Sequence, residues 1–566
     1  MVAPGIYTVE VSAPGLQTFE ERGIVMNQGN TLALPKVVLQ VETNKEQVEV
    51  ISGADVIVPL DTGQSSQTLN REMVEQLSIV GRDAAELIKI MPGMAMTGGL
   101  GQGMWNSYTT ASNSGPIGAF SANGTQPNGA ITLTSDGASL VDPGCQCTQT
   151  ANTNQNQVAQ VTILTSAYGA EFAKGPVVFQ SIGKSGGSQF HGQAYLYARN
   201  GTFNAQDSFS KSQGIQPVWD TYYYPGGDLG GPVIIPGTHF NKNHDKLFFY
   251  AAYEYMDQHP QSSLFQYFLP TQQMLQGNFG PAYLATLGPG FANSHPDANV
   301  VPCASACNAG LSFPGGMLPQ SLLDPNSLAY IGTFPKPNAD PVTNLAGANY
   351  NYLYGPPVNR WELRLRGDYS VSDNTRVYVS WNRQREYDQN PISVWWWVGG
   401  SLPYPSQQPA IQKSEIYSAN LVHTFSPRLT NEFLFAEATF LNPVKLSNPA
   451  AVNPAALPFS MKGLFSDPFT PQIPNVFGFN SAISGYSAPT YGEPWPAGGT
   501  NAFGKYSQTP SISDNLTKVW GDAHVEGRGV WRLRAQQPDL RRVDGRSARG
   551  RGVRELGRHQ HQQPAG

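Results

Sequence analysis

The sequence contains few charged residues and lacks any long run of apolar residues. Charged residues make up 13% of the 566 positions, about half the ~25% of ordinary soluble domains, which excludes a highly charged, disordered chain. The net charge of −5 gives no reason to expect a nucleic-acid partner. No stretch approaches the ~18 consecutive apolar residues of a transmembrane helix. Membrane-spanning strands remain compatible with the sequence, because they need only about 9–11 residues that alternate in polarity.

The sequence also lacks the patterns of common catalytic and metal sites. It contains no G-x-S-x-G elbow, no H-E-x-x-H pair and no P-loop, and its nine His form no recognisable metal triad. The four cysteines fall as Cys145/Cys147 and Cys303/Cys307, without a nearby His at zinc-finger spacing. We interpret them as loop cysteines or short disulfides, of which Cys145–Cys147 would be strained; a metal site is the less favoured alternative. We therefore predict that the protein is not an enzyme and has no metal and no cofactor.

Turn-forming and aromatic residues are abundant, which favours many short strands. The chain has 59 Gly and 45 Pro, and aromatic residues make up 11% of it. Apolar and polar residues alternate repeatedly after residue 188, as in strands with two different faces. The apolar stripes run through Phe190–Ala198, Leu247–Tyr255, Trp361–Tyr369, Val377–Trp381, Tyr417–Phe425 and Leu429–Phe435. The predicted fold class is therefore mostly β and antiparallel.

The connections between these stripes are short at one end and long at the other. Short turns fall at 372–374 and 426–428, and long connections span roughly 260–355 and 385–412. Outer-membrane β-barrels show this asymmetry, because their periplasmic turns are short. A soluble jelly roll gives similar stripes, so periodicity alone leaves a membrane barrel and a soluble double sheet both open.

The most specific pattern lies at residues 157–192, QVAQVTILTSAYGAEFAKGPVVFQSIGKSGGSQFHG. It resembles a motif of TonB-dependent outer-membrane receptors of the Oar-like type. The matching positions are Tyr168, Ala170, Glu171, Lys184, Ser185, Gly186, Phe190, His191 and Gly192. Ala173, Pro176 and Ile182 depart from the motif. Since Pro176 cannot donate to a sheet ladder, we expect a bulge or an edge there.

The resemblance implies a barrel of about 22 strands whose lumen is blocked by a small α+β plug domain. Residues 58–187 correspond to the plug, and residues 188–521 to the N-terminal part of a transmembrane β-barrel, which is a partial barrel. We expect Asn70 to cap a helix that follows it, and Asp83 to open a second helix at Ala84–Ile90. Asp136-Gly137 is expected to form a turn, and Lys184–Gly187 a flexible link to the barrel.

Two segments precede the expected plug. Residues 1–45 alternate like short strands and resemble the second half of a carboxypeptidase-regulatory-like β-sandwich, so we interpret them as a remnant of that domain. Residues 46–57 form a linker in which Val48, Glu49, Val50 and Ile51 resemble a TonB box. Such a box binds a TonB-type periplasmic energy transducer by adding a strand to it. An ordinary strand end is the alternative interpretation.

The chain changes character near Gly521. Ten of the 21 Arg, and none of the 14 Lys, lie in the last 46 residues. An Arg-rich tail can be a nucleic-acid or membrane-binding arm, but we favour a disordered or out-of-frame tail at 522–566, because the strand expected there finds no continuation. The start at Met1 lacks a signal peptide, and residues 188–521 are too few for the implied barrel. We therefore expect an incomplete piece of a longer chain.

A cluster of three tryptophans, Trp395, Trp396 and Trp397, lies in a segment bounded by Pro and Gly. It could stack on a sugar or planar extracellular ligand, or belong to the aromatic girdle that contacts outer-membrane lipid; we favour the girdle. The implied function is binding and energised import of an unknown ligand, such as a siderophore or an oligosaccharide, across the cell outer membrane. The alternative is a secreted or surface β-sandwich adhesin that binds carbohydrate. A compact double layer with a filled apolar centre would contradict the receptor.

Overall fold

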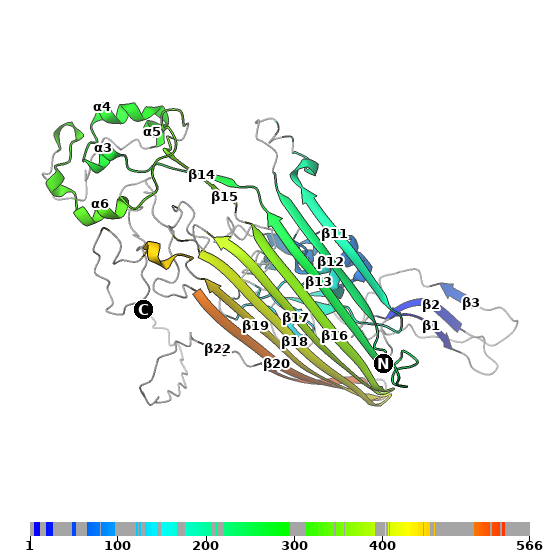
Figure 1. Cartoon of the computed structure of the whole chain (residues 1–566). Coiled ribbons are helices and arrows are strands. Elements are labelled where there is room, and N and C mark those ends of the chain that lie inside the picture. The colour runs from blue at the N-terminus through cyan, green and yellow to red at the C-terminus, as the bar shows by residue number, and fades with distance from the viewer. Residues whose placement is uncertain are drawn as a thin grey trace, which may run out of the picture.

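The computed structural model of the protein describes residues 5–11, 19–26, 48–51, 65–77, 79, 81–96, 120–122, 124–125, 131–143, 146, 149–166, 176–206, 208, 211, 219–294, 313–344, 347–355, 357–390, 402, 406, 408–444, 447–452, 458, 503–520, 523–532 and 535–537. Most of these residues lie in antiparallel strands, as the sequence predicts. One long sheet dominates the molecule, and a smaller five-stranded sheet lies against it (Figure 1).

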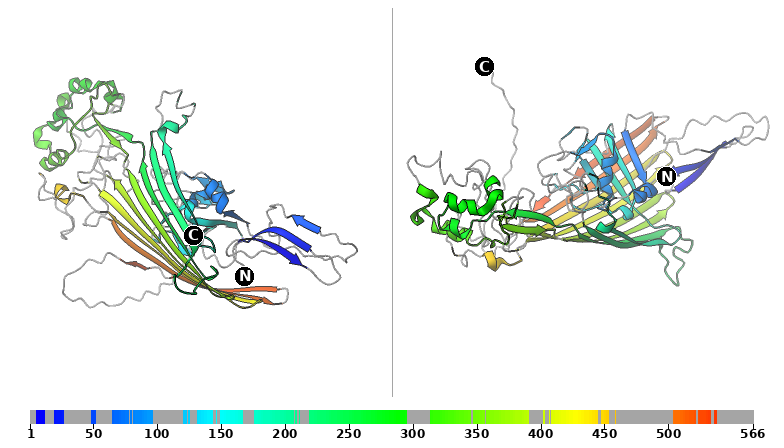
Figure 2. Two further views of the ribbon diagram at one scale, coloured as in Figure 1. Left: turned by 45° about the vertical axis from the view of Figure 1, so that its right-hand side comes forward. Right: turned by 90° about the horizontal axis from the view of Figure 1, so that it is seen from above.

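The long sheet contains ten strands, mostly in chain order. Its path is β11 (His191–Asn200), β12 (Thr221–Pro232), β13 (Leu247–His259), β16 (Val358–Ser372), β17 (Thr375–Asn390), β18 (Gln408–Ser426), β19 (Leu429–Val444), β20 (Phe503–Trp520) and β21 (Ala523–Arg532). The short β22 (Ala535–Gln537) also pairs with β20. Neighbours are antiparallel, and the sheet curves like part of a barrel wall (Figures 1 and 2). In the described residues, β11 and β21 do not pair with each other, so the barrel is partial.

The polarity of the two faces of the long sheet is the reverse of that in a soluble protein. The outer face carries exposed apolar side chains at Leu196, Leu229, Tyr253, Leu365, Val379, Leu421, Phe433, Ile512 and Leu516. The inner face carries buried polar and charged side chains at Glu254, Arg364, Ser380, Gln384, Ser414, Ser418, Asn420, Ser511 and Ser513. Because hydrocarbon favours apolar groups and a lumen favours polar ones, this pattern is that of a membrane barrel strand. The predicted alternation of the stripes is confirmed.

The five-stranded sheet and its short helices form a unit that we name the inner domain. Its strands are ordered β4 (Ser65–Asn70), β9 (Val158–Ser166), β10 (Val177–Gly183), β7 (Ile131–Ser135) and β8 (Ala138–Ser139). Only the β10–β7 pair is parallel. The remaining elements are α1 (Arg71–Gln76), the 3-10 helices η1 (Ala84–Ile90) and η2 (Gln155–Gln157), and the pair β5 (Met94–Met96) and β6 (Phe120–Ala122). The inner domain lies against the concave, inner face of the long sheet (Figure 2).

The local signals predicted for the inner domain are present. The Asn70 side chain accepts from the Met73 amide at 2.9 Å and caps α1. Asp83 caps η1 by accepting from the Ala85 amide at 3.0 Å, although η1 is a 3-10 helix. Asp136 and Gly137 form the β7–β8 turn, both with positive φ. The bulge or edge expected at Pro176 is not found at that position: Pro176 stands just before β10, a central strand of this sheet, where it interrupts no ladder.

An apolar core holds the inner domain together and reaches the long sheet. Its fully buried members include Val74, Ile88, Leu133, Val161, Ile163 and Phe179. Ile416 on β18 and Ala436 and Ala438 on β19 belong to the same cluster. Small and apolar residues on the inner face of the long sheet therefore form a seat for the inner domain at β18 and β19.

The long connection expected at 260–355 contains regular structure that the sequence analysis does not predict. A two-stranded ribbon, β14 (Ser263–Tyr267) paired with β15 (Tyr350–Tyr354), leads from β13 toward β16. Between its strands lie α3 (Gln272–Leu275), α4 (Pro281–Leu284), η4 (Ala285–Leu287), α5 (Gly288–Ser294), η5 (Pro314–Gly316), η6 (Gln320–Leu322) and α6 (Pro325–Ile331). These helices gather beyond one end of the long strands (Figure 1). Two further 3-10 turns are η3 (Gly201–Phe203) and η8 (Pro449–Val452).

The second long connection is shorter than predicted. The strands β17 and β18 extend to Asn390 and from Gln408, so the connection does not span 385–412. No helix in the described residues is long and apolar enough to cross a membrane.

The N-terminal segment forms a three-stranded sheet of β1 (Gly5–Val11), β2 (Phe19–Met26) and β3 (Val48–Ile51). The β1–β2 pair is antiparallel and the β2–β3 pair is parallel. The interpretation of residues 1–45 as a sandwich remnant stays a prediction, as do the other domain limits. At the other end, β21 continues the long sheet past Gly521 and lies within the segment expected to be a disordered or out-of-frame tail.

Candidate functional site

Buried charged side chains concentrate where the inner domain meets the inner face of the long sheet. In a chain with so few charges, such a concentration is informative, because burying an unpaired charge is costly. Three contacts form this concentration of charge. Each is named after the residue that comes from the inner domain or from the chain directly after it. They are the Arg82 contact, the Lys184 contact and the Asp136 contact.

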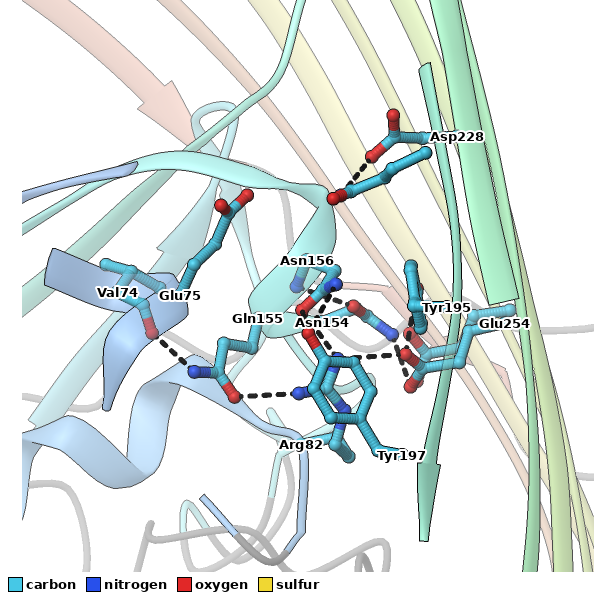
Figure 3. Close-up of polar contacts among 12 residues, drawn as sticks. Val74, Glu75, Arg82, Asn154, Gln155, Asn156, Tyr195, Tyr197, Asp228 and Glu254 are labelled. Carbon is cyan, nitrogen blue, oxygen red and sulfur yellow. Dashed lines mark hydrogen bonds and ion pairs between the residues drawn. The ribbon is translucent and has the colours of Figure 1, made fainter. Parts of the chain in front are cut away.

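The Arg82 contact joins the start of η1 to β13. The Arg82 guanidinium lies 3.1 Å from the Glu254 carboxylate, and both side chains are almost fully buried. The same guanidinium donates to Gln155 at 3.0 Å and to Asn156 at 2.6 Å, and it stacks 3.9 Å above the Tyr197 ring (Figure 3). Arg82 therefore connects the inner domain to two strands of the long sheet.

Backbone geometry holds Arg82 in place. Its φ is +60°, a conformation that non-glycine residues seldom adopt. The Gln155 amide donates to the Arg82 carbonyl at 3.0 Å, and the Arg82 amide donates to the Ile79 carbonyl at 3.3 Å. Arg82 thus lies in a strained backbone conformation. The hydrogen bond from Gln155 of η2 holds its carbonyl, and its guanidinium points toward the long sheet.

Glu254 has partners from both bodies. Asn154 of the inner domain donates to its carboxylate at 2.8 Å, and the Tyr195 hydroxyl on β11 donates at 2.9 Å (Figure 3). Gly226 pairs with both Tyr195 and Glu254 across the sheet, and a Cβ there would meet the Tyr195 ring. The absent side chain lets Tyr195 reach the carboxylate across β12.

The Lys184 contact lies where the chain leaves the inner domain. The Lys184 ammonium lies 2.6 Å from Glu75 on α1 and 3.4 Å from Asp228 on β12, and its side chain is 4% exposed. Gln193 on β11 donates to the same Asp228 carboxylate at 2.8 Å. Burial acts to raise the pKa of the Glu75 carboxyl, but Lys184 and Arg71 outweigh it and hold that pKa below its ordinary value. The prediction that Lys184 belongs to a flexible link is wrong, because its side chain is buried and forms two ion pairs.

The Asp136 contact lies at the β7–β8 turn. The Arg364 guanidinium on β16 donates to the Asp136 carboxylate, and the Ser380 hydroxyl on β17 donates to it at 3.3 Å. Arg366 lies 4.0 Å from the same carboxylate, and the Gly183 amide donates to it at 2.9 Å. Burial acts to raise the pKa of Asp136, but the Arg364 and Arg366 charges outweigh it and hold the pKa below its ordinary value.

Neutral contacts extend the interface along the sheet. The Asn152 amide donates to Gln384 on β17 at 2.8 Å, and the Ser414 hydroxyl on β18 donates to the Thr150 carbonyl. On β20, the Thr509 hydroxyl donates to the Ser139 carbonyl at 3.5 Å. The inner domain is thus bound to long-sheet strands from β11 to β20.

The arrangement favours docking over catalysis. Its charged groups are paired with each other across two bodies. The described residues contain no group of three or more His, Cys, Asp or Glu that could hold a metal ion. Paired charges in a protected interface can hold a domain in one orientation and release it when one partner is removed.

The residues singled out from the sequence lie elsewhere. Val48–Ile51 form β3, which pairs with β2 apart from the interface (Figure 1). Trp395, Trp396 and Trp397, and all four cysteines, lie outside the described residues. The charges of the three contacts were not predicted as a site. Their signal was present on β16, where Arg360, Glu362, Arg364 and Arg366 alternate with apolar residues and so must share the inner face.

The family match supports the fold. The family model described as the outer membrane beta barrel domain matches residues 182–548. Among solved structures, the outer membrane transporter YddB from Escherichia coli is 8% identical, has a TM-score of 0.43 and matches 82% of this chain over 47% of its own. The siderophore receptors PirA from Pseudomonas aeruginosa and from Acinetobacter baumannii are each 11% identical, have TM-scores of 0.35 and 0.36, and match 82% of this chain over 51% and 57% of their own. The chain thus spans about half the length of these structures. No curated protein matches it.

Proposed function

Because this chain belongs to the outer membrane beta barrel family, we propose that it acts as a transport receptor whose lumen is closed by the inner domain as a plug. The family confirms the predictions of an outer-membrane location and of a protein that is not an enzyme. The single observation that carries the proposal is the Arg82 contact: a buried ion pair joins the inner domain to the polar inner face of a sheet whose other face is apolar.

The proposed mechanism is gated passage without a covalent step. The inner face of the long sheet offers polar groups that water can solvate when the inner domain moves. The ion pairs define one closed position, and their separation exposes a hydrated path. The binding of an extracellular ligand, of a class still to be identified, would precede this movement.

We assign the energy source to a TonB-type periplasmic transducer. Val48–Ile51 is a four-residue strand with alternating β-branched residues and precedes the inner domain in the chain. An extended segment of this kind can add to the edge of a partner's sheet through main-chain hydrogen bonds. A pull on it would be transmitted to β4, an edge strand of the inner domain.

Site-specific photo-crosslinking in cells that produce the protein tests this assignment. A benzoyl-phenylalanine at Val50 is expected to yield a crosslink to the periplasmic transducer, and the yield should rise when ligand is present. The same group at Thr8 on β1 is the matched control, because it lies in the same sheet outside the proposed box. Equal yields at the two positions would contradict a TonB box at Val48–Ile51.

The ligand-contact proposal concerns Trp395, Trp396 and Trp397. Three neighbouring indoles offer stacking surface for a sugar or a planar ligand, such as an oligosaccharide or a siderophore. Because the girdle is the favoured interpretation, replacing Trp396 by alanine should lower the heat stability of the barrel and leave ligand uptake unchanged. Lowered uptake with unchanged stability would instead assign the cluster to ligand contact.

The structure does not favour the alternative of a β-sandwich adhesin. Such a protein needs two sheets that bury a common apolar centre. In the described residues, the long strands form one layer, and its inner face carries charged side chains against the inner domain. Fractionation of cells decides between the two: recovery in the outer-membrane fraction supports the receptor, and recovery in the medium supports the adhesin.

A further inference from the structure

The Asp136 contact has the composition of an anion-binding site on the inner face of the long sheet. Arg364 and Arg366 lie on the same face of β16, two residues apart, and Arg366 pairs directly with Ser380 on β17. Each of the three residues is at most 4% exposed. Two guanidinium groups and a hydroxyl converge there on one carboxylate, and arginine is well suited to binding carboxylate and phosphate oxygens.

The carboxylate in this site comes from the inner domain and not from the long sheet. Asp136 lies at φ +46° in a two-residue turn, which directs its side chain toward β16 and β17. It thus reaches the long sheet from the tip of a hairpin. If the hairpin withdrew, the site would keep all its long-sheet donors and lose only its anion.

Arg364 differs from its neighbours on the inner face of β16. Arg360 pairs with Glu362 and Glu386, and Arg366 pairs with Asp368, all within the long sheet. Among the described residues, the only ion pair of Arg364 is with Asp136, and its buried Nε has no hydrogen-bond partner. A buried donor without a hydrogen-bond partner, and a counter-ion that comes from the inner domain, both indicate a position that another anion could occupy.

The local backbone is shaped around this guanidinium. A Cβ at position 183 would overlap the Arg364 guanidinium in its present position, so a side chain there would displace the guanidinium. The Gly183 carbonyl accepts from Arg366 at 3.2 Å, while the Gly183 amide donates to Asp136 at 2.9 Å. The Arg366 guanidinium also lies 4.1 Å from the centre of the Tyr378 ring. Arg366 is therefore held in place by more than its attraction to Asp136.

We propose that Arg364, Arg366 and Ser380 form a binding site for a compact oxyanion, a carboxylate or phosphate group of the transported ligand, and that Asp136 occupies it while the inner domain is closed. This proposal rests on the transport function proposed above. A ligand anion and Asp136 cannot occupy the site together, so the ligand competes with the closed position of the β7–β8 hairpin. Occupation by the ligand also removes the cost of leaving buried guanidinium groups unpaired.

Inorganic phosphate and acetate serve as probes on the purified full chain. The variant Asp136→Asn keeps a residue that tolerates positive φ and removes the resident charge. We expect it to bind phosphate at least about tenfold more tightly than the unmodified protein, since charge-assisted hydrogen bonds become available. A matching gain for acetate would identify a carboxylate site, and a gain for phosphate alone a phosphate site.

Two variants test whether the gain arises at this site. Adding Arg364→Gln to Asp136→Asn should abolish the gain. Glu75→Gln also removes a partly buried carboxylate paired with a cation, but at the Lys184 contact, and it should give no gain. Equal phosphate affinity in Asp136→Asn and the unmodified protein, or a gain that survives Arg364→Gln, would overturn the proposal.

A measurement on the unmodified protein covers the case in which Asp136→Asn does not fold. Phosphate should accelerate amide hydrogen exchange at 131–139 relative to chloride at the same ionic strength, because it competes with Asp136. Exchange at 71–76, near the Lys184 contact, should not respond. Identical exchange at 131–139 in the two salts would refute the site. A missing crosslink at Val50 would instead refute the energised transport, so the two failures are distinguishable.

Discussion

Replacing Arg82 by methionine tests the interface most directly. The change removes the guanidinium and keeps a long apolar stem, which leaves the Glu254 carboxylate buried without its cation. Asn154 and Tyr195 still donate to that carboxylate at 2.8 and 2.9 Å, so part of its stabilisation remains. Breaking a buried pair by removing one partner costs roughly 3–5 kcal/mol. Because both side chains are almost fully buried, solvent screening does not reduce this figure greatly.

Native-state hydrogen exchange measures that cost as the opening free energy of the inner domain. Suitable probes are the Ala84 amide, which donates to the Thr153 carbonyl at 2.7 Å, and the Gln155 amide, which donates to the Arg82 carbonyl at 3.0 Å. A loss of 3 kcal/mol corresponds to an increase of about 150-fold in exchange rate. Amides in β17 should keep their protection, because the long sheet does not depend on Arg82 for its ladders.

A double-mutant cycle with Glu254→Gln isolates the pair itself. Once Arg82 is methionine, removing the Glu254 charge should cost much less than in the unmodified protein. Arg71→Gln is the matched control, because the Arg71 side chain is about half exposed in its pair with Glu75 and should contribute at most about 1 kcal/mol. If the two single changes add without coupling, or if Arg82→Met costs no more than Arg71→Gln, the reasoning from the buried ion pair is refuted.

Three further predictions concern other parts of the structure. Gly183→Ala should force the Arg364 guanidinium away from Asp136 and lower the opening free energy by about 1–3 kcal/mol. Amide hydrogen exchange at 131–139 should then be faster, and an unchanged exchange rate would contradict this prediction. The closed state lowers the pKa of Asp136 from its ordinary 3.8. The Asp136 charge therefore stabilises the closed state above about pH 3.8, and this contribution is lost as the pH falls through the lowered pKa. The opening free energy should decrease over that pH range, and it should decrease less in Asp136→Asn. Leu196→Arg places a charge on the exposed apolar face and should destabilise the barrel in a bilayer by about 2–4 kcal/mol. Thr202→Arg, in η3 beyond the strand end, should leave that stability unchanged.

Local physics made much of the long sheet predictable from the sequence. Alternation with a period of two fixes which residues share a face, so Leu196 and Val379 were expected in apolar stripes, and both are exposed on the outer face. Asn70 and the Asp136-Gly137 pair act through their own backbones, within a few residues, and were expected as a cap and a turn. Such signals need no knowledge of distant contacts.

The site was not predictable in the same way, because its contacts join distant parts of the chain. Arg82 and Glu254 are 172 residues apart, and Asp136 and Arg364 are 228 apart. Periodicity can place Glu254 on the inner face, but it does not name the side chain that neutralises it. Lys184 was misjudged for a related reason. Its neighbours Ser185 and Gly186 indicate a flexible link, while the partners that bury it lie on α1 and β12.

The helices between β14 and β15 show a different limit. Each of α3 to α6 has only four to seven residues, which is too short for an amphipathic period to be recognised. They are also too short to be stable alone, and they depend on small apolar clusters such as the one that contains Met274, Leu284 and Phe291. A pattern search therefore sees only a long connection there.

The chemistry of the interface bears on how the inner domain could move. An interface of large apolar side chains would hold the two bodies together, but its separation would expose apolar surface to water at a cost of roughly 25 cal/mol per Å². Among the described residues, the long sheet contributes only Ile416, Ala436 and Ala438 to the buried apolar core, and the three named contacts are formed by charged and hydroxyl groups. Water can solvate these groups after separation, which offsets much of the lost pairing. A domain bound mainly through paired charges is specific when closed and recoverable when open, as the proposed plug would need to be.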